Sequence, residues 1–153
     1  MQSAAVKHQY SEEEAEIRGI IDAVNEAHYS KDAAIIAGHY AADAALFTLA
    51  PPLVHHGMNL VELQSWLDSW DGPIESESRD LSVIVSGGLA FVQGFNRLCG
   101  NPKSAGGARV SFWMRATWCL RLVDGDWKIL SEHTSVPFYM DGSMRPAFDL
   151  EPE

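Results

Sequence analysis

The chain has 153 residues, a formal net charge of -10 and a pI of about 4.9. With 46% apolar and 21% charged residues, it is expected to fold as one globular domain with a sizeable core. The excess of carboxylates repels phosphate backbones and anionic lipid headgroups. Neither nucleic acid nor a membrane surface is therefore an expected partner.

The two cysteines, Cys99 and Cys119, lie in apolar runs and form no Cys-x-x-Cys pair. This pattern predicts two buried free thiols rather than a zinc or redox site. The opening residues, MQSAAVKHQYSEEE, contain no hydrophobic run of signal-peptide length, and no stretch of the sequence is apolar enough to predict a membrane span. We therefore expect a cytoplasmic protein.

Three helices are predicted in the first half of the chain. Ser11, followed by Glu14 three residues later, forms a capping-box pattern, and apolar residues at helical spacing then run to about Tyr29. A short second helix is expected over residues 33–39. The segment MNLVELQSWLDSW has its leucines and tryptophans on one helical face, which predicts the third helix.

Strands are predicted for the rest of the chain. Residues 44–49 form a short first strand, and residues 80–95 contain two strands joined by a glycine turn. Residues 109–123 and 126–138 form two long strands joined by a tight turn.

Helices that precede a contiguous run of antiparallel strands are typical of an α+β fold. We expect one curved antiparallel sheet with the three N-terminal helices packed on its concave face. The predicted domain covers residues 1–139, and residues 140–153 form an acidic C-terminal tail.

The turn Asp124-Gly125 decides which side chains of the last two strands meet. A two-residue turn pairs Leu120 with Ile129, and an unbroken register then pairs Ala116 with His133. One mostly apolar face would hold Met114, Ala116, Trp118, Leu120, Ile129, Ser131, His133 and Ser135. A three-residue turn would instead gather Arg115, Thr117, His133 and Ser135 on one face.

Three polar residues lie together on that predicted apolar face, and polar groups without partners in a core cost about 1–3 kcal/mol each. We interpret them as the wall of a cavity. His133 is the candidate general acid or base, and Met114, Trp118, Ser131 and Ser135 are the candidate ligand-binding residues. The alternative is a core histidine bonded to a backbone carbonyl.

The remaining histidines carry weaker signals. His28, beside Tyr29 at the end of the first helix, can reach the mouth of the pocket or pack at the helix end. His55 and His56 have no further ligands at suitable spacing, which favours a solvated pair over a metal site. We predict no metal and no cofactor.

The opposite face of the last hairpin carries Trp113 and Leu130 and is too apolar for a fully solvated sheet. We interpret this outer face as the interface of a homodimer.

Residues 115–138, RATWCLRLVDGDWKILSEHTSVPF, with HYAADAALF (39–47) and Gly57, resemble the SnoaL-like polyketide cyclase and ketosteroid isomerase superfamily, which has the nuclear transport factor 2-like fold. The Thr117…Asp124-Gly125-x-Trp127…His133-x-Ser135 pattern also resembles the calcium/calmodulin-dependent kinase II association domain. The resemblance implies a cone-shaped, cystatin-like α+β half-barrel, commonly a dimer, with a deep apolar pocket.

In the steroid isomerases of this family, an aspartate on the strand after the second helix is the base. Here that region reads ALFTLAPPLVHHG and contains no carboxylate. Two hypotheses follow from the fold and the residues. The first is a cofactor-independent isomerase, cyclase or dehydratase that acts on a hydrophobic substrate with His133 as acid or base. The second is a non-catalytic module that holds a small hydrophobic or acidic molecule or assembles into oligomers.

Overall fold

A computed structural model of the chain describes residues 10–153. The first half contains, in order, α1 (Glu12–Tyr29), α2 (Ala33–Gly38), β1 (Tyr40–Phe47), β2 (His55–His56) and α3 (Leu60–Asp68). The second half contains β3 (Trp70–Ser86), β4 (Leu89–Pro102), the 3-10 turn η1 (Lys103–Ala105), β5 (Val110–Val123) and β6 (Asp126–Ser135). The predicted order of helices and strands is confirmed. The short strand β2 was not predicted.

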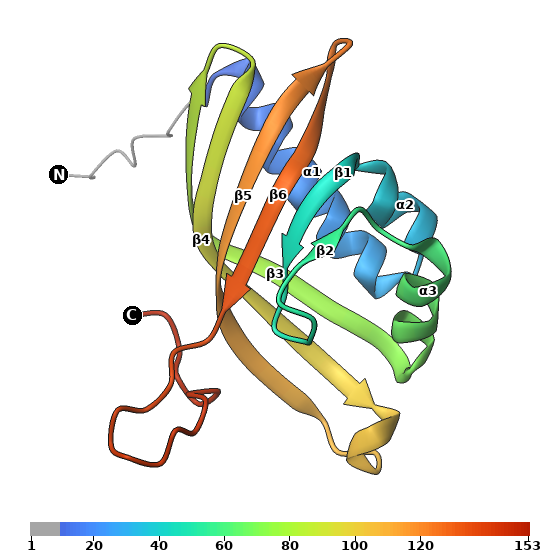
Figure 1. Cartoon of the computed structure of the whole chain (residues 1–153), viewed down its shortest axis with the longest axis vertical. Coiled ribbons are helices and arrows are strands. Elements are labelled where there is room, and N and C mark those ends of the chain that lie inside the picture. Colours follow the sequence, from blue (N-terminus) through green and yellow to red (C-terminus); the bar gives the residue numbers. More distant parts are fainter. Residues whose placement is uncertain (1–9) are drawn as a thin grey trace, which may run out of the picture.

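One six-stranded sheet has the order β2-β1-β6-β5-β4-β3. Neighbouring strands are antiparallel except β1 and β6, which run parallel. The long strands curve strongly, and the helices lie on one side of the sheet, with α1 crossing it (Figure 1). The α1 helix packs chiefly against β3, α2 lies against α1 and β1, and α3 lies against α2 and β3. The α+β architecture with a curved open sheet is confirmed.

The helices begin where polar caps satisfy their free N–H groups. The Ser11 hydroxyl accepts a hydrogen bond from the Glu14 N–H at 3.1 Å, as the capping pattern predicts. Asn59 caps α3 by accepting from two backbone N–H groups, those of Val61 and Glu62. These caps fix where α1 and α3 begin.

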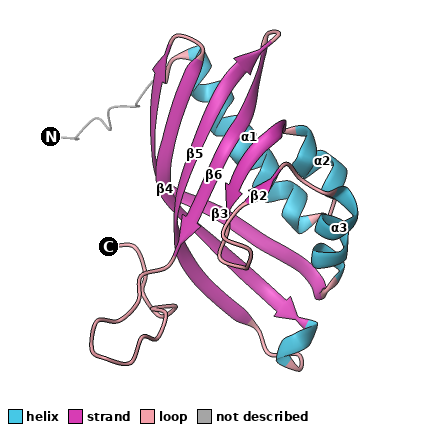
Figure 2. Cartoon of the chain, in the orientation of Figure 1, coloured by secondary structure: helices cyan, strands magenta, loops and turns pink. Residues whose placement is uncertain are grey.

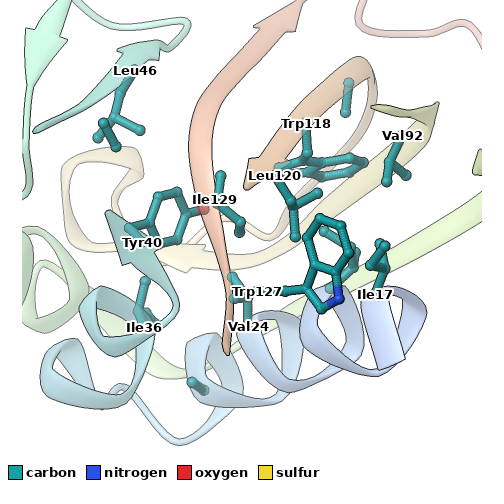
Figure 3. Close-up of a cluster of buried hydrophobic side chains, with 14 of the residues drawn as sticks. Ile17, Val24, Ile36, Tyr40, Leu46, Val92, Trp118, Leu120, Trp127 and Ile129 are labelled. Atoms are coloured by element: carbon teal, nitrogen blue, oxygen red, sulfur yellow. The ribbon is translucent and has the colours of Figure 1, made fainter. Parts of the chain in front are cut away.

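The core lies between α1 and the inner, concave face of the sheet. Ile17, Ile21 and Val24 project from α1 and are almost completely buried. They meet side chains of β5 and β6, among them Trp118, Leu120, Trp127 and Ile129 (Figure 3). Burial of each such side chain contributes about 1.5–3 kcal/mol, so this contact holds the helix on the sheet.

The register of β5 and β6 changes at Leu130. The turn has two residues, Asp124 and Gly125, as predicted, and both have positive φ. Leu120 pairs with Ile129, which confirms the first part of the predicted register.

The next pair along the hairpin joins Cys119 to Ser131, so Leu130 is an extra residue of β6 without a partner on β5. Such a bulge reverses the side on which every later side chain points. The predicted register beyond this bulge is wrong: Trp118 faces Glu132, and Thr117 faces His133.

The segment after β6 contains no helix or strand but folds back on itself (Figure 2). Tyr139 N–H donates to the Arg145 carbonyl at 2.9 Å, and the Ala147 N–H donates to the Pro137 carbonyl at 2.8 Å. The segment extends away from the sheet (Figure 1), and the Met140 side chain within it is 91% exposed. None of the helices in residues 10–153 combines the length and the apolar character needed to cross a bilayer.

Candidate functional site

The carboxylate of Glu132 is the charged group that β6 presents to the inner face. Because of the bulge at Leu130, Glu132 pairs with Trp118 and shares its face. On the other side, β1 places Leu46 next to Glu132 in the parallel pair of strands, and Leu46 is buried. The structure therefore holds a half-buried carboxylate between apolar neighbours.

Two buried donors fix this carboxylate. The Tyr40 hydroxyl donates to Glu132 Oε1 at 3.0 Å, and the Trp118 indole N–H donates to the same oxygen at 2.8 Å. Tyr40 is 7% exposed and Trp118 is 3% exposed. Hydrogen bonds to a charged acceptor are roughly twice as strong as neutral ones, so three strands, β1, β5 and β6, are joined at one atom.

Burial raises the pKa of Tyr40 well above its usual range, and the charge and hydrogen bond of Glu132 raise it further. The phenol is therefore protonated at neutral pH and acts as a donor. Figure 3 shows its ring between Ile36 and Ile129, with Leu46 on the far side of it.

The second oxygen of Glu132 is open. Oε2 accepts no hydrogen bond from any side chain or backbone group of residues 10–153. In that part of the chain, Arg97 Nε is the single buried side-chain nitrogen or oxygen without a hydrogen-bond partner. Oε2 is therefore not sealed in the core, and it can receive a donor from water or a ligand.

His28 lies in the last turn of α1. Its ring packs edge-on against Trp66 of α3, with 6.1 Å between the ring centroids. Nδ1 lies 2.8 Å from the Val24 carbonyl. Burial lowers the pKa of His28, while its bond to Val24 and the charge of Glu132 oppose that shift. His28 is therefore mostly neutral at pH 7.

The structure separates the predicted site residues into two groups. Met114 and Trp118 are buried on the inner face, as predicted. Ser131, His133 and Ser135 lie on the outer face, because the bulge precedes them. The expected inward position of His133 is wrong: the residue is exposed.

On the outer face, the rings of His133 and Phe47 stack with 5.3 Å between their centroids. Close by, Ser135 accepts a hydrogen bond from Arg115 Nε at 3.1 Å. Glu132 faces Trp118 and so does not share this outer face with Arg115 and Thr117. Arg115, Thr117, His133 and Ser135 therefore share one face, as a three-residue turn would have placed them. The cause is the bulge at Leu130, not the turn.

Sequence reasoning missed Glu132 and Tyr40 and named His28 without assigning it to the site. A usable signal was present in residues 127–136. Trp127 and Ile129 alternate regularly, but Leu130 places two apolar residues in succession, which breaks the alternation. After Leu130, Glu132 and Val136 are an even number of residues apart and so point to the same side of the strand. Because Val136 is apolar, this side is the inner one.

Two surface clefts lie away from Glu132. One, of about 470 Å³, lies between α1 and β3 and is lined by acidic residues and Arg97; the other, of about 550 Å³, lies between α2 and α3. In the first cleft Arg97 Nε lies 3.2 Å from Glu77 Oε1, as an ion pair without hydrogen-bond geometry. No cluster of three or more His, Cys, Asp or Glu side chains in residues 10–153 is arranged to hold a metal.

Comparison with known families agrees with this architecture. The model of the SnoaL-like domain matches residues 17–139. This chain belongs to the SnoaL-like domain family. No curated protein matches the sequence.

Solved structures show the same fold. A nuclear transport factor 2-like protein of unknown function from Pseudomonas putida KT2440 has 30% sequence identity and a TM-score of 0.78, over 92% of this chain and 96% of that one. A ketosteroid isomerase-like protein from Erwinia carotovora atroseptica has 22% identity and a TM-score of 0.65, over 82% and 97%.

A candidate calcium/calmodulin dependent protein kinase II association domain from Xanthomonas campestris has 18% identity and a TM-score of 0.68, over 88% and 94%. The SnoaL-like domain model and the Pseudomonas putida structure place the chain in the SnoaL-like and nuclear transport factor 2-like superfamily. A nuclear transport factor 2-like protein from Novosphingobium aromaticivorans, with 18% identity and a TM-score of 0.66 over 86% and 84%, has a cystatin-like fold.

Proposed function

We propose that this SnoaL-like protein binds a small, largely apolar molecule on the inner face of its sheet, against Glu132, Met114 and Trp118. We further propose that it catalyses cofactor-independent acid–base chemistry of the isomerase, cyclase or dehydratase type. The observation that carries the proposal is the carboxylate of Glu132, held through one oxygen by Tyr40 and Trp118 while its other oxygen is open. A reducing compartment such as the cytoplasm agrees with the two free thiols.

The arrangement supports acid–base chemistry for a physical reason. A general acid or base must be oriented and must reach its substrate by a hydrogen bond. The two donors on Oε1 orient the carboxylate and lower the cost of its negative charge. Oε2 accepts no hydrogen bond from residues 10–153, so it is available to a substrate group. The ketosteroid isomerase-like neighbour agrees with chemistry of this kind.

His133 was the first candidate for this role because of its expected inward position. The outer-face location gives it a different neighbourhood, with Phe47 on one side. We therefore assign the acid–base role to Glu132 and use His133 as the comparison residue.

The proposal is tested with neutral enones whose double bond can migrate, followed by ultraviolet absorbance. Glu132→Gln keeps the size and one acceptor oxygen but cannot exchange a proton at neutral pH, so turnover should fall by about 100-fold or more. His133→Gln should retain wild-type turnover. Loss of turnover in His133→Gln with full activity in Glu132→Gln would return the role to His133.

A second candidate function is assembly, without catalysis, through the outer face of the sheet. Four large apolar side chains on that face are more than a third exposed: Phe47 at 37%, Ile84 at 61%, Leu89 at 55% and Phe91 at 39%. Ile84, Leu89 and Phe91 lie together on β3 and β4, because Ile84 pairs with Phe91, and soluble monomers rarely expose large contiguous apolar patches. We propose that a second copy covers this face to form a homodimer related by two-fold symmetry.

Light scattering across a dilution series tests the homodimer. Phe91→Glu places a charge in the patch and should shift the protein toward monomer. The matched control is Val61→Glu on α3, where Val61 is 79% exposed but lies away from the outer face. A wild-type protein that is monomeric at every concentration contradicts the assembly proposal. That result would not bear on the proposed role of Glu132.

A further inference from the structure

Residues 136–153, which we call the C-terminal arm, hold a defined shape after the end of β6. The Tyr139 hydroxyl lies 2.7 Å from both carboxylate oxygens of Asp149, and the Arg145 guanidinium lies over the Tyr139 ring, 5.8 Å from its centroid. Ala147 is 2% exposed. Together with the backbone bonds described above, these contacts fix the arm in one conformation.

The arm nevertheless presents apolar side chains to water. Five of its large apolar residues are exposed: Met140 at 91%, Met144 at 67%, Phe138 at 55%, Leu150 at 48% and Phe148 at 44%. Single exposed apolar residues are common on protein surfaces, but a concentration of them on one short ordered segment marks an interaction surface.

The arm also ends in unpaired negative charge. It contains the carboxylates of Asp141, Asp149, Glu151 and Glu153 and a single cation, Arg145. Glu151 and Glu153 are exposed, and neither forms an ion pair with a residue of the range 10–153. A surface that binds the arm should therefore be apolar and carry an available cation.

The outer face has a patch of this composition, formed by Ile84, Leu89, Phe91 and Arg121, which we call the outer patch. Ile84 pairs with Phe91, and Leu89 pairs with Arg121, so the four residues are neighbours on β3, β4 and β5. Arg121 is exposed and has no carboxylate partner within residues 10–153, although acidic residues outnumber lysines and arginines by 21 to 11. The outer patch and the arm thus match in both apolar character and charge.

The arm and the outer patch lie at opposite ends of the same strands. The arm begins after Ser135, which pairs with Arg115, and Arg121 lies about 20 Å further along β5, toward the Asp124-Gly125 turn. The arm of one copy therefore extends away from its own outer patch (Figure 1). If two sheets pack outer face to outer face about a two-fold axis that crosses the strands, the arm end of each copy lies opposite the patch end of the other.

We propose that the C-terminal arm of each copy packs on the outer patch of a second copy, with Glu151 and Glu153 against Arg121. This inference deepens the homodimer proposed above and rests on it. The net charge of -10 makes two copies repel each other, and ion pairs between arm and outer patch oppose this repulsion at the interface.

Exchange of charge between arm and outer patch tests the contact in the full chain. Sedimentation velocity over a dilution series gives the dimer Kd. Glu151→Lys with Glu153→Lys should raise the Kd about tenfold or more, and Arg121→Glu should do the same, because like charges then face each other. The matched control, Glu16→Lys with Glu26→Lys, makes the same change in net charge at two exposed positions of α1 and should leave the Kd within about threefold.

Mixing the two weakened variants shows whether the contact joins different copies. In the mixed dimer, the lysines of one arm face the new glutamate at position 121 of the other copy, and the unchanged arm faces the unchanged Arg121. The mixture should therefore associate with nearly the wild-type Kd. A contact within one chain would be restored only when both changes are made in the same chain.

Met140 tests the apolar part of the contact with little effect on the fold, because its side chain is 91% exposed. Met140→Ser should raise the Kd about fivefold or more, since a buried methionine is lost from each of the two contacts. Leu53→Ser, at a side chain that is 94% exposed before β2, is the control and should not change the Kd.

The outcomes separate this inference from the homodimer on which it rests. A dimer that Phe91→Glu dissociates, but that the arm variants and Met140→Ser leave intact, overturns the arm contact and leaves the outer-face homodimer standing. Recovery confined to the chain that carries both charge changes also overturns the arm contact. A wild-type protein that is monomeric at every concentration contradicts both.

Discussion

The bonds from Tyr40 and Trp118 to Glu132 can be measured as a coupling free energy in unfolding experiments. Glu132→Ala leaves a buried hydroxyl and a buried indole N–H without an acceptor. Each unsatisfied donor costs about 1–3 kcal/mol, so the free energy of unfolding should fall by about 2–6 kcal/mol. Glu132→Gln keeps an acceptor oxygen and loses only the charge assistance of two bonds, which costs about 1–3 kcal/mol.

The coupling is isolated by adding Tyr40→Phe. In that background Glu132→Ala leaves one donor unsatisfied instead of two, so its cost should be smaller than in the wild type by about 1–3 kcal/mol. Urea denaturation followed by far-ultraviolet circular dichroism gives the four free energies. The exposed His133, changed to Ala, is the control and should alter stability by less than about 0.5 kcal/mol. Additivity of the two substitutions within about 0.5 kcal/mol would refute the reasoning.

Further predictions concern pH and backbone packing. His28 has a lowered pKa in the folded protein, so the unfolded chain binds its proton first as the pH falls below the ordinary value of 6.5. The free energy of unfolding should therefore decrease below that pH, and the decrease should be smaller in His28→Phe. Both proteins should also carry His39→Gln. This removes a second contribution, because burial and the charge of Lys128 also lower the pKa of His39. A Cβ on Gly94 would lie 2.9 Å from the Arg79 carbonyl oxygen, so Gly94→Ala should destabilise by about 1–3 kcal/mol in a thermal melt. Gly19→Ala on α1 meets no atom within 4 Å and should stabilise by about 0.5–1 kcal/mol; equal effects of the two alanines would contradict this packing.

Local signals were enough to predict most of the fold. The cap at Ser11 and the helical spacing after it lie within one stretch of chain, and the Asp124-Gly125 turn brings its own strands together. The parallel pairing of β1 with β6 joins segments about 90 residues apart, as in the bond between Tyr40 and Glu132. No local pattern encodes that pairing, so Tyr40 was not assigned to the site.

The position of His133 shows why the site was harder to predict than the fold. A sequence-based prediction assigns side chains to alternate faces of the sheet, residue by residue along the strand. One extra residue in the strand therefore reverses the predicted face of every later side chain. Up to Ile129 the predicted pairs are the observed ones; from Ser131 onward they are displaced by the bulge at Leu130. Met114 and Trp118 lie on the predicted face because they belong to β5, which pairs with β4 without a bulge.

The central claim is that Glu132, and not His133, lies on the inner face and accepts the Trp118 indole proton. Its most direct test is the proton–nitrogen resonance of the Trp118 indole, assigned with Trp118→Phe and compared in Glu132→Gln and His133→Gln. The account predicts a clear shift and faster hydrogen exchange in Glu132→Gln, with neither change in His133→Gln. A resonance that moves with His133→Gln and ignores Glu132→Gln would contradict it.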